Sequence, residues 1–195
     1  MLSTAYNKKR IIIGISGASG VIMGVELLRE LKNRADMETH LVMTHGAINT
    51  LRLETDLSAD YVGGLADFRY DAGDLAADIA SGSFETCGMI IMPCSMKSVA
   101  GIACGYSDNL LLRAADVCLK EKRKLILVPR ESPLSAIHLK NLRAAAKAGA
   151  IIAPPMLTFY NHADTIEKQI QHIIGKVLMQ FNITTDSFTP WHNGE

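Results

Sequence analysis

Short runs of apolar, mostly β-branched residues alternate along the chain with longer stretches of helical hydrophobic spacing. The short runs predict strands at 10–15, 39–43, 88–92, 124–128 and 150–153. The longer stretches predict helices at about 20–34, 45–54, 74–80, 96–104, 108–121, 135–148 and 164–181. The strands are apolar at nearly every position, which is typical of strands buried on both faces of a parallel sheet. The alternation therefore predicts a single-domain, doubly wound α/β fold of the Rossmann or flavodoxin type, with a mainly parallel sheet and helices on both faces.

The domain limits follow from the same pattern. Alternation begins near residue 10 and ends near 182, so we predict one α/β domain at 10–182. Residues 1–9 and 183–195 are then an N-terminal and a C-terminal tail, and 55–73 is the least regular part of the domain. The second tail carries the lone Trp191, which should pack on this subunit or on a neighbouring one.

Charge and cysteine content narrow the class of protein. Lys plus Arg and Asp plus Glu both number 20, so the formal net charge is zero, whereas a general nucleic-acid binder is basic with its charge clustered. No apolar stretch approaches the roughly 20 residues that span a bilayer, and the first ten residues show no signal-peptide cleavage site. The four cysteines lack CxxC spacing and lie in apolar surroundings. These features predict a cytoplasmic protein with reduced core cysteines, no metal site, and neither nucleic acid nor membrane as a partner.

Cations embedded in the stretch 108–133 point to an anionic ligand. Arg113 and Lys120 lie on one stripe of an otherwise apolar helix, with Asp116 between them. Buried cations are unfavourable unless they are paired or bind an anion. Arg130 follows at the end of a strand, where open α/β sheets bind ligands. We expect these cations to converge on a phosphorylated ligand, and a purely structural Arg113–Asp116 ion pair is the alternative.

Two loops are candidates for holding that ligand. The first strand is followed by Gly14-Ile-Ser-Gly17-Ala-Ser-Gly20, whose glycines and free N–H groups suit a phosphate. This loop departs from the dinucleotide fingerprint at Ile15, and no acidic residue follows the second strand to hold an adenosine ribose. Both departures favour FMN over NAD. After the third strand, Ser95 is predicted to cap a helix whose first N–H groups face a ligand. A tight turn without a ligand, and capping alone, are the alternatives.

Several motifs in order along the chain carry a family resemblance. They are Gly14-Ile-Ser-Gly-Ala-Ser-Gly20, Pro93-Cys-Ser-Met-Lys-Ser98, Arg113-Ala-Ala-Asp-Val-Cys-Leu-Lys-Glu121, Val128-Pro-Arg-Glu-Ser-Pro133, His138-Leu-Lys-Asn141 and Ala153-Pro-Pro-Met-Leu-Thr-Phe-Tyr160. Together they resemble the UbiX-type flavin prenyltransferases over residues 10–191. The segments 38–44, 81–84 and 95–97 most resemble the branch associated with hydroxyarylic (phenolic) acid decarboxylases.

The resemblance implies an activity and an assembly. Such enzymes transfer a dimethylallyl group from dimethylallyl phosphate to N5 and C6 of reduced FMN, which is a substrate rather than a resident cofactor. The product, prenylated FMN, is handed to a UbiD-type decarboxylase. Family members build the site at subunit contacts, commonly in a dodecamer.

The resemblance also implies roles for particular residues. It places around FMN the residues Gly17, Ala18, Ser19, Thr44, Ser95, Met96, Lys97, Ser98, Arg113 and Arg130. It assigns the prenyl phosphate to Tyr160 and Lys176, with Lys120 nearby. The expected catalytic residues are Glu131, Lys120, Glu54 and Trp191.

The reaction needs charge stabilised on the leaving phosphate. The chain has no Asp-rich motif for Mg²⁺, so fixed cations are the candidates, namely Lys120, Arg130 and Lys176 with the Tyr160 hydroxyl. Glu131 is the candidate for moving a proton, and the Trp191 ring face could stabilise an allylic cation.

Three positions depart from the usual family pattern. Thr44 stands where many members have Ser, and the hydroxyl is kept. Lys176 stands where many have Arg, which keeps the charge but loses the bidentate fork. His162-Ala163 replaces a commoner His-Pro, so the loop after Tyr160 loses a rigid residue.

Three other functions stay open at this point. An FMN-dependent cysteine decarboxylase has a similar fold, but it usually shows Pro-Ala-Ser-Ala-Asn where this chain has Pro-Cys-Ser-Met-Lys. A non-catalytic flavin carrier, as accessory subunit of a hydroxyarylic acid decarboxylase, would use the same pocket. Direct decarboxylation of an aromatic acid is the third, and no residues beyond the flavin site favour it.

Overall fold

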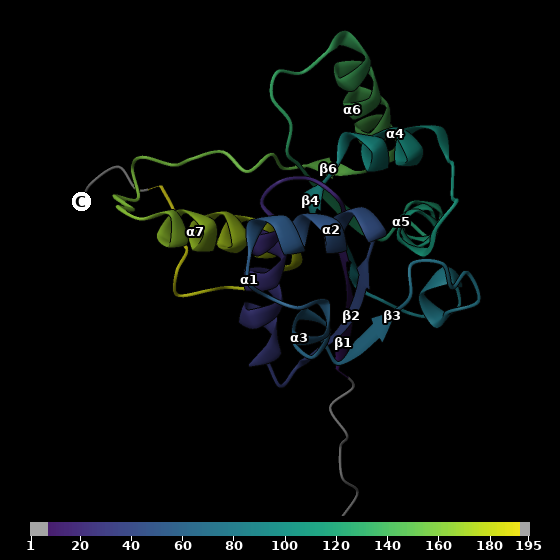
Figure 1. Ribbon diagram of the computed structural model, residues 1–195, viewed down its shortest axis with the longest axis horizontal. Helices are drawn as coiled ribbons and strands as arrows, with labels where there is room; N and C mark the ends of the chain where they lie inside the picture. The colour runs from purple at the N-terminus through teal and green to yellow at the C-terminus, as the bar shows by residue number, and fades with distance from the viewer. Residues whose placement is uncertain (1–7, 192–195) are drawn as a thin grey trace, which may run out of the picture.

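A six-stranded parallel sheet is the centre of the fold, as a computed structural model of the chain shows for residues 8–191 (Figure 1). The strand order is β3-β2-β1-β4-β5-β6, and every neighbouring pair is parallel. The strands are β1 Lys9–Ile15, β2 Met37–Met43, β3 Phe68–Tyr70, β4 Gly88–Cys94, β5 Lys124–Pro129 and β6 Ile151–Ile152. The predicted doubly wound α/β fold is confirmed. The outer parts of both predicted tails, 1–7 and 192–195, lie outside the described residues.

Helices cover both faces of this sheet. They are α1 Val21–Lys32, α2 His45–Glu54, α3 Ala59–Gly63, α4 Met96–Cys104, α5 Leu110–Lys120, α6 Ala136–Ala148 and α7 Ile166–Leu178, with short 3₁₀ helices at Asp78–Ala80 and Met179–Phe181. Alternate residues of β1 enter two separate core layers, because successive side chains of a strand point to opposite faces. Ile11, Ile13 and Ile15 pack in the layer under α1 and α7, and Ile12 packs in the layer under α5. None of the described helices is long and apolar enough to cross a membrane.

Two parts project from this body. Helix α6 stands out beyond the carboxyl ends of the strands, beside α4 (Figure 1). Residues 154–165, here called the arm, run out in extended form next to α7 (Figure 1). Both projecting parts carry exposed apolar side chains, among them Ile137 on α6 and Phe159 on the arm.

The predicted helix at 74–80 is wrong. Only Asp78–Ala80 is helical there, and as a 3₁₀ turn. The carboxylates of Asp71 and Asp74 accept hydrogen bonds from backbone N–H groups two residues further on, at 2.7 and 3.0 Å. Such local bonds compete with the helical ones, so aspartates of this spacing favour turns.

The irregular segment 55–73 contains two elements that the hydrophobic pattern does not predict. Ser58 caps the short helix α3 by accepting from the Tyr61 N–H at 3.0 Å. Strand β3 then adds to the free edge of β2. It has three residues and is largely exposed, and edge strands of this kind carry no apolar run.

Candidate functional site

A cavity of about 610 Å³ opens at the carboxyl ends of β1, β2 and β4. The chain passes from β1 outwards to β2 and β3 and then returns to β4 on the other side of β1, so the cavity lies at the topological switch point of the sheet. Six residues predicted to bind FMN line it, together with Glu131: Gly17, Thr44, Ser95, Met96, Lys97 and Ser98. Its volume falls in the range of roughly 300–1,000 Å³ that small-molecule sites occupy.

Hydrogen bonds join the two loops that form one wall of this cavity. The Ser16 hydroxyl donates to the Pro93 carbonyl at 3.1 Å and accepts from the Ser95 N–H at 2.7 Å. Ser95 caps α4 as predicted, because its hydroxyl accepts from the N–H of Ser98 at 3.3 Å. A helix start leaves its first N–H groups without partners inside the helix. Met96 and Lys97, the first residues of α4, line the cavity, so the positive end of this helix is at the cavity.

Two glycines bring the first loop against the start of α2 at this cavity. A Cβ on Gly17 would lie 2.9 Å from the Cα and carbonyl carbon of Gly46, so the backbones of the first loop and of α2 touch. Between them Thr44 caps α2 by accepting from the Ala47 N–H at 3.1 Å. The cavity fits a phosphorylated, planar ligand. Its glycines leave room for a flat ring, and its hydroxyls, the start of α4 and the Lys97 ammonium suit a phosphate.

Glu54 contacts the start of α1, outside the cavity. Its carboxylate accepts from the N–H groups of Gly20 and Val21 at 2.8 and 3.3 Å. It therefore satisfies the positive end of α1 that the first loop was expected to offer to a phosphate. Ala18 and Ser19 do not line the cavity either. Within one chain, Gly17 is therefore the only residue of the first loop that lines the cavity.

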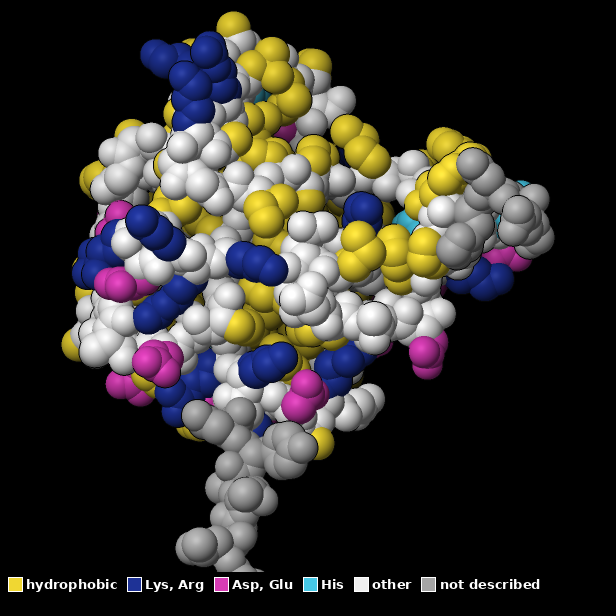
Figure 2. Space-filling view, turned by 180° about the vertical axis from the view of Figure 1, so that it is seen from behind, with side chains coloured by type: hydrophobic (Ala, Val, Ile, Leu, Met, Phe, Trp, Pro, Cys, Tyr) yellow, Lys and Arg dark blue, Asp and Glu magenta, His cyan; other side chains and the backbone are white. Residues whose placement is uncertain are grey.

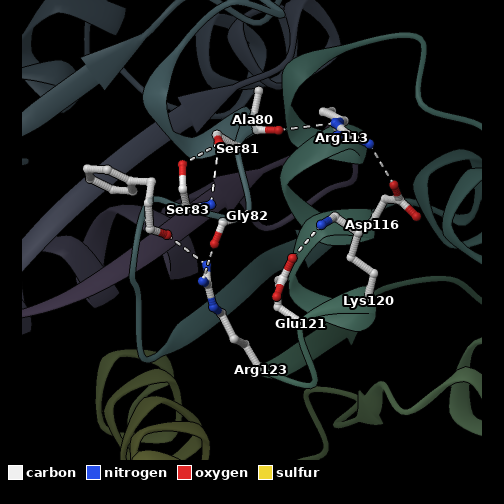
Figure 3. Close-up of polar contacts among 10 residues, drawn as sticks. Ala80, Ser81, Gly82, Ser83, Arg113, Asp116, Lys120, Glu121 and Arg123 are labelled. Carbon is white, nitrogen blue, oxygen red and sulfur yellow. Dashed lines mark hydrogen bonds and ion pairs between the residues drawn. The ribbon is translucent and has the colours of Figure 1, made fainter.

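The predicted convergence of the cations in 108–133 is wrong for a single chain. Arg113 is not buried: 38% of its side chain is exposed, and it pairs with Asp116 at 2.9 Å (Figure 3). Lys120 ends α5 and bonds the neighbouring Glu121 (Figure 3). Lys120 lies about 15 Å along the helix from its start at Leu110, and a crossover helix runs antiparallel to the strands that it connects. Lys120 is therefore near the amino ends of the strands, whereas Arg130 follows the carboxyl end of β5.

Among the predicted site residues of that segment, all of which the structure describes, only Glu131 lines the cavity. It lines the wall next to α4, and its carboxylate accepts from the Ser132 N–H at 3.0 Å. It does not cap α6, because Ser135 does so by accepting from the His138 N–H at 3.2 Å. Arg130 is exposed and its side chain does not line the cavity.

Tyr160 and Lys176 lie together in a second cavity, of about 160 Å³, between the arm and α7. The Tyr160 ring packs edge-on against Trp191, with 5.0 Å between ring centroids, so the expected packing of that tryptophan is confirmed. His172 also lines this cavity, and its ring contacts Tyr160 edge-on and Phe188 at a tilt. Burial lowers the pKa of His172, and the Lys176 charge lowers it further. The sequence pattern did not single out His172, although it precedes Lys176 by four residues and so shares its helix face.

Several lining residues of the first cavity were missed. They are His45, Gly46, Ala72, Gly73, Asp108 and Asn109. Lys97 and Asp108 approach to 3.7 Å across the cavity. Asn109 caps α5 by accepting from the Leu112 N–H at 3.0 Å, and a capping residue at that position was a usable signal. Among residues 8–191 no group of three or more His, Cys, Asp or Glu side chains is arranged to hold a metal ion.

Comparison with known proteins gives long matches. The sequence matches the family described as Flavoprotein over residues 1–182. A probable UbiX-like flavin prenyltransferase from Sedimentibacter hydroxybenzoicus is 56% identical over 182 residues, which cover 93% of this chain and 96% of that one. AnUbiX (PadA1), solved in complex with FMN and dimethylallyl pyrophosphate, has a TM-score of 0.94 at 44% identity, covering 97% of this chain and 100% of that one. A dodecameric FMN-dependent UbiX-like decarboxylase from Escherichia coli O157:H7 has a TM-score of 0.92 at 49% identity, covering 94% and 100%.

Proposed function

The chain belongs to the Flavoprotein family and, within it, to the UbiX-type flavin prenyltransferases, and from this premise we propose the reaction. The enzyme joins the dimethylallyl group of dimethylallyl phosphate to N5 and C6 of reduced FMN, releasing phosphate. The observation that carries the proposal is the cavity at the switch point, where six residues expected to bind FMN and the expected proton carrier Glu131 meet.

The residues of this cavity fit FMN. Gly17 and Thr44 would hold one side of the flavin, and the start of α4 at Met96 and Lys97 would hold the other. Reduced FMN supplies the electron-rich ring that is alkylated. Glu131 also lines this cavity and would accept and pass on the proton that C6 loses when its carbon–carbon bond to the prenyl group forms.

The second cavity fits the prenyl phosphate. Lys176 would hold the phosphate by charge, and the Tyr160 hydroxyl would donate to it. The Tyr160 ring lines this cavity and packs edge-on against Trp191, and it would shield one side of the cavity from water. A dry, positive surrounding stabilises the charge that develops on the leaving oxygen as the C–O bond breaks.

A complete site requires more than one copy of the chain. The described lining residues of the two cavities do not overlap, and Lys120 is distant from the first. Hydrophobic side chains gather on α6 and on the arm (Figure 2), where Ile137 is 69% and Phe159 is 82% exposed. Exposed apolar surface of this extent marks an interaction site. Since one solved relative is a dodecamer, we infer that this chain forms a homo-oligomer of the same kind, with each site shared between copies.

The product and the compartment follow from the chemistry. Prenylated FMN would be passed to a UbiD-type decarboxylase that acts on an aromatic acid. All four cysteines are free thiols, which is typical of a reducing compartment, so we place the reaction in the cytoplasm.

One experiment tests the reaction directly. The protein is incubated without oxygen with reduced FMN and dimethylallyl phosphate, and the flavin is extracted for mass spectrometry. The expected result is a flavin heavier by one dimethylallyl unit, formed only when both substrates are present. Bound FMN of unchanged mass would support the carrier alternative, and release of CO₂ from a cysteine-ended peptide would support the cysteine decarboxylase alternative.

A further inference from the structure

The segment 80–84, which leads from a 3₁₀ turn towards β4, is held by two arginines. The Arg113 Nε donates to the Ala80 carbonyl at 3.2 Å. The Arg123 guanidinium donates to the carbonyls of Phe84 and Gly82 at 2.7 and 2.6 Å (Figure 3). Hydrogen bonds from a charged donor are stronger than neutral ones. The 80–84 loop is therefore fixed relative to α5 and to the turn that follows it.

A buried polar network holds the same loop from the sheet side. The Phe84 ring packs edge-on against His40, with 5.1 Å between centroids, and the Arg10 guanidinium lies 4.6 Å above the Phe84 ring. His40 is only 2% exposed and bonds Glu38 at 3.0 Å and the Tyr70 hydroxyl at 2.9 Å. Burial lowers the pKa of His40, so the neutral ring donates from Nε2 to Glu38 and accepts at Nδ1 from Tyr70. The loop is thus fixed on two sides.

Gly82 is the point at which this loop touches Lys120. A Cβ on Gly82 would lie 2.8 Å from the Lys120 Nζ and 2.2 Å from the Glu121 Oε1. The Lys120 ammonium also bonds the Glu121 carboxylate and holds the pKa of Glu121 below its usual value. The backbone of Gly82 and the Glu121 carboxylate therefore lie together on one side of the ammonium (Figure 3).

We propose that the 80–84 loop and Glu121 position the Lys120 ammonium. Gly82 is the residue through which the loop contacts the ammonium and limits where it can lie. This rests on the proposed function and on the expectation from the family resemblance that Lys120 lies near the prenyl phosphate, at a site shared between copies. A lysine is a point charge on a flexible stem, and it stabilises a leaving phosphate efficiently only when it is held in place beforehand. The arginines and the His40 network fix the loop, and the loop with Glu121 fixes the lysine.

The substitution Gly82→Ala separates positioning from folding. The new methyl group would collide only with the ends of two flexible side chains, and Gly82 does not have a positive φ. The fold should therefore be kept, while the ammonium of Lys120 is displaced. We expect FMN affinity and the melting temperature to stay as in the wild type. We expect kcat for prenylation to fall by about tenfold to a hundredfold, as for a misplacement of about 1 Å.

Gly64→Ala is the matched control. The Cβ at position 64 would have ordinary contacts of 3.5 Å with two carbonyl oxygens of α3, and this variant should prenylate FMN like the wild type.

A second pair of variants tests the hydrogen bonds that Arg123 donates to the loop. Arg123→Gln should lower kcat and Arg123→Lys should restore part of it. The charge-matched Lys122→Gln should have no effect, because the Lys122 side chain makes no hydrogen bond or ion pair with the other residues of 8–191, and its only bond is that of its backbone N–H to the Leu119 carbonyl.

The outcomes are distinguishable. Normal prenylation by Gly82→Ala overturns the inference and leaves the proposed function intact. Parallel losses of FMN affinity, melting temperature and kcat in that variant also overturn it, because they indicate a purely structural loop. Failure of the wild-type protein to prenylate FMN refutes the proposed function and this inference with it.

Discussion

Gly17→Ala is the substitution that tests the FMN cavity most directly. A Cβ at this position would lie 2.9 Å from two backbone atoms of Gly46, whereas ordinary contacts begin at 3.4 Å. The two backbone segments would have to separate by the difference, 0.5 Å. No flexible side chain can move aside here, because the atoms that collide belong to the start of α2. The wall of the cavity itself must therefore shift.

The magnitude follows from two opposing effects. Overpacking a close contact costs about 1–3 kcal/mol. Replacing Gly by Ala also restricts the unfolded chain, which offsets about 0.4–1 kcal/mol of that cost. A net destabilisation of about 1–2 kcal/mol is expected in the free energy of unfolding. If FMN binds only when the wall has its original position, the free energy needed to restore that position is lost from binding. FMN affinity then falls by about tenfold for each 1.4 kcal/mol of this cost.

Flavin fluorescence titration and urea unfolding of the same protein samples measure both effects. Gly46→Ala is the graded control, because its Cβ would lie 3.3 Å from the Gly17 Cα, which is tight but short of a collision. We expect that variant to bind FMN within about twofold of the wild type. Wild-type affinity in Gly17→Ala, or a larger loss in Gly46→Ala, would refute the assignment of this wall to FMN.

Three further predictions concern other parts of the molecule. Glu54→Ala should lower the free energy of unfolding by about 0.5–2 kcal/mol, because two N–H groups at the start of α1 lose their acceptor; lost prenylation at unchanged stability would instead support the predicted catalytic role. Burial lowers the pKa of His40, so the unfolded chain binds a proton more readily and stability should fall as pH drops below about 6.5. Urea unfolding at several pH values should show a weaker fall in His40→Gln. Lys176→Ala should raise the KM for dimethylallyl phosphate at constant FMN affinity, and steady-state kinetics should show that Lys176→Arg retains binding.

The buried strands and the meeting of two loops at the first cavity were predictable for a simple physical reason. A strand buried on both faces needs an apolar run, as β1 has at Ile11 to Ile13. The carboxyl ends of parallel strands lie at one edge of a sheet, so loops that follow different strands meet. Gly17 and Ser95 are therefore neighbours in the cavity although they follow separate strands.

Other features depend on packing between distant elements, which local pattern does not encode. Strand β3 is short and exposed, so it has no apolar run. The contact of Glu54 with Gly20 spans 34 residues and requires α1 and α2 to be already packed. The helix pattern of α5 places Arg113 and Lys120 on one stripe. The exposure of that stripe depends on which elements pack against it, and the Arg113 side chain is left 38% exposed.

That openness changes what the cations of α5 can do. Arg113 and Lys120 each have an acidic partner within the chain, and all four side chains are between 36% and 48% exposed. Ion pairs exposed to this degree contribute only about 0–1 kcal/mol, whereas breaking a buried pair would cost several times more. A phosphate dianion from a neighbouring copy's site could therefore attract either cation at little cost. Had the helix been buried on most sides, as the sequence pattern predicted, drawing either cation away from its acidic partner would have cost several times more.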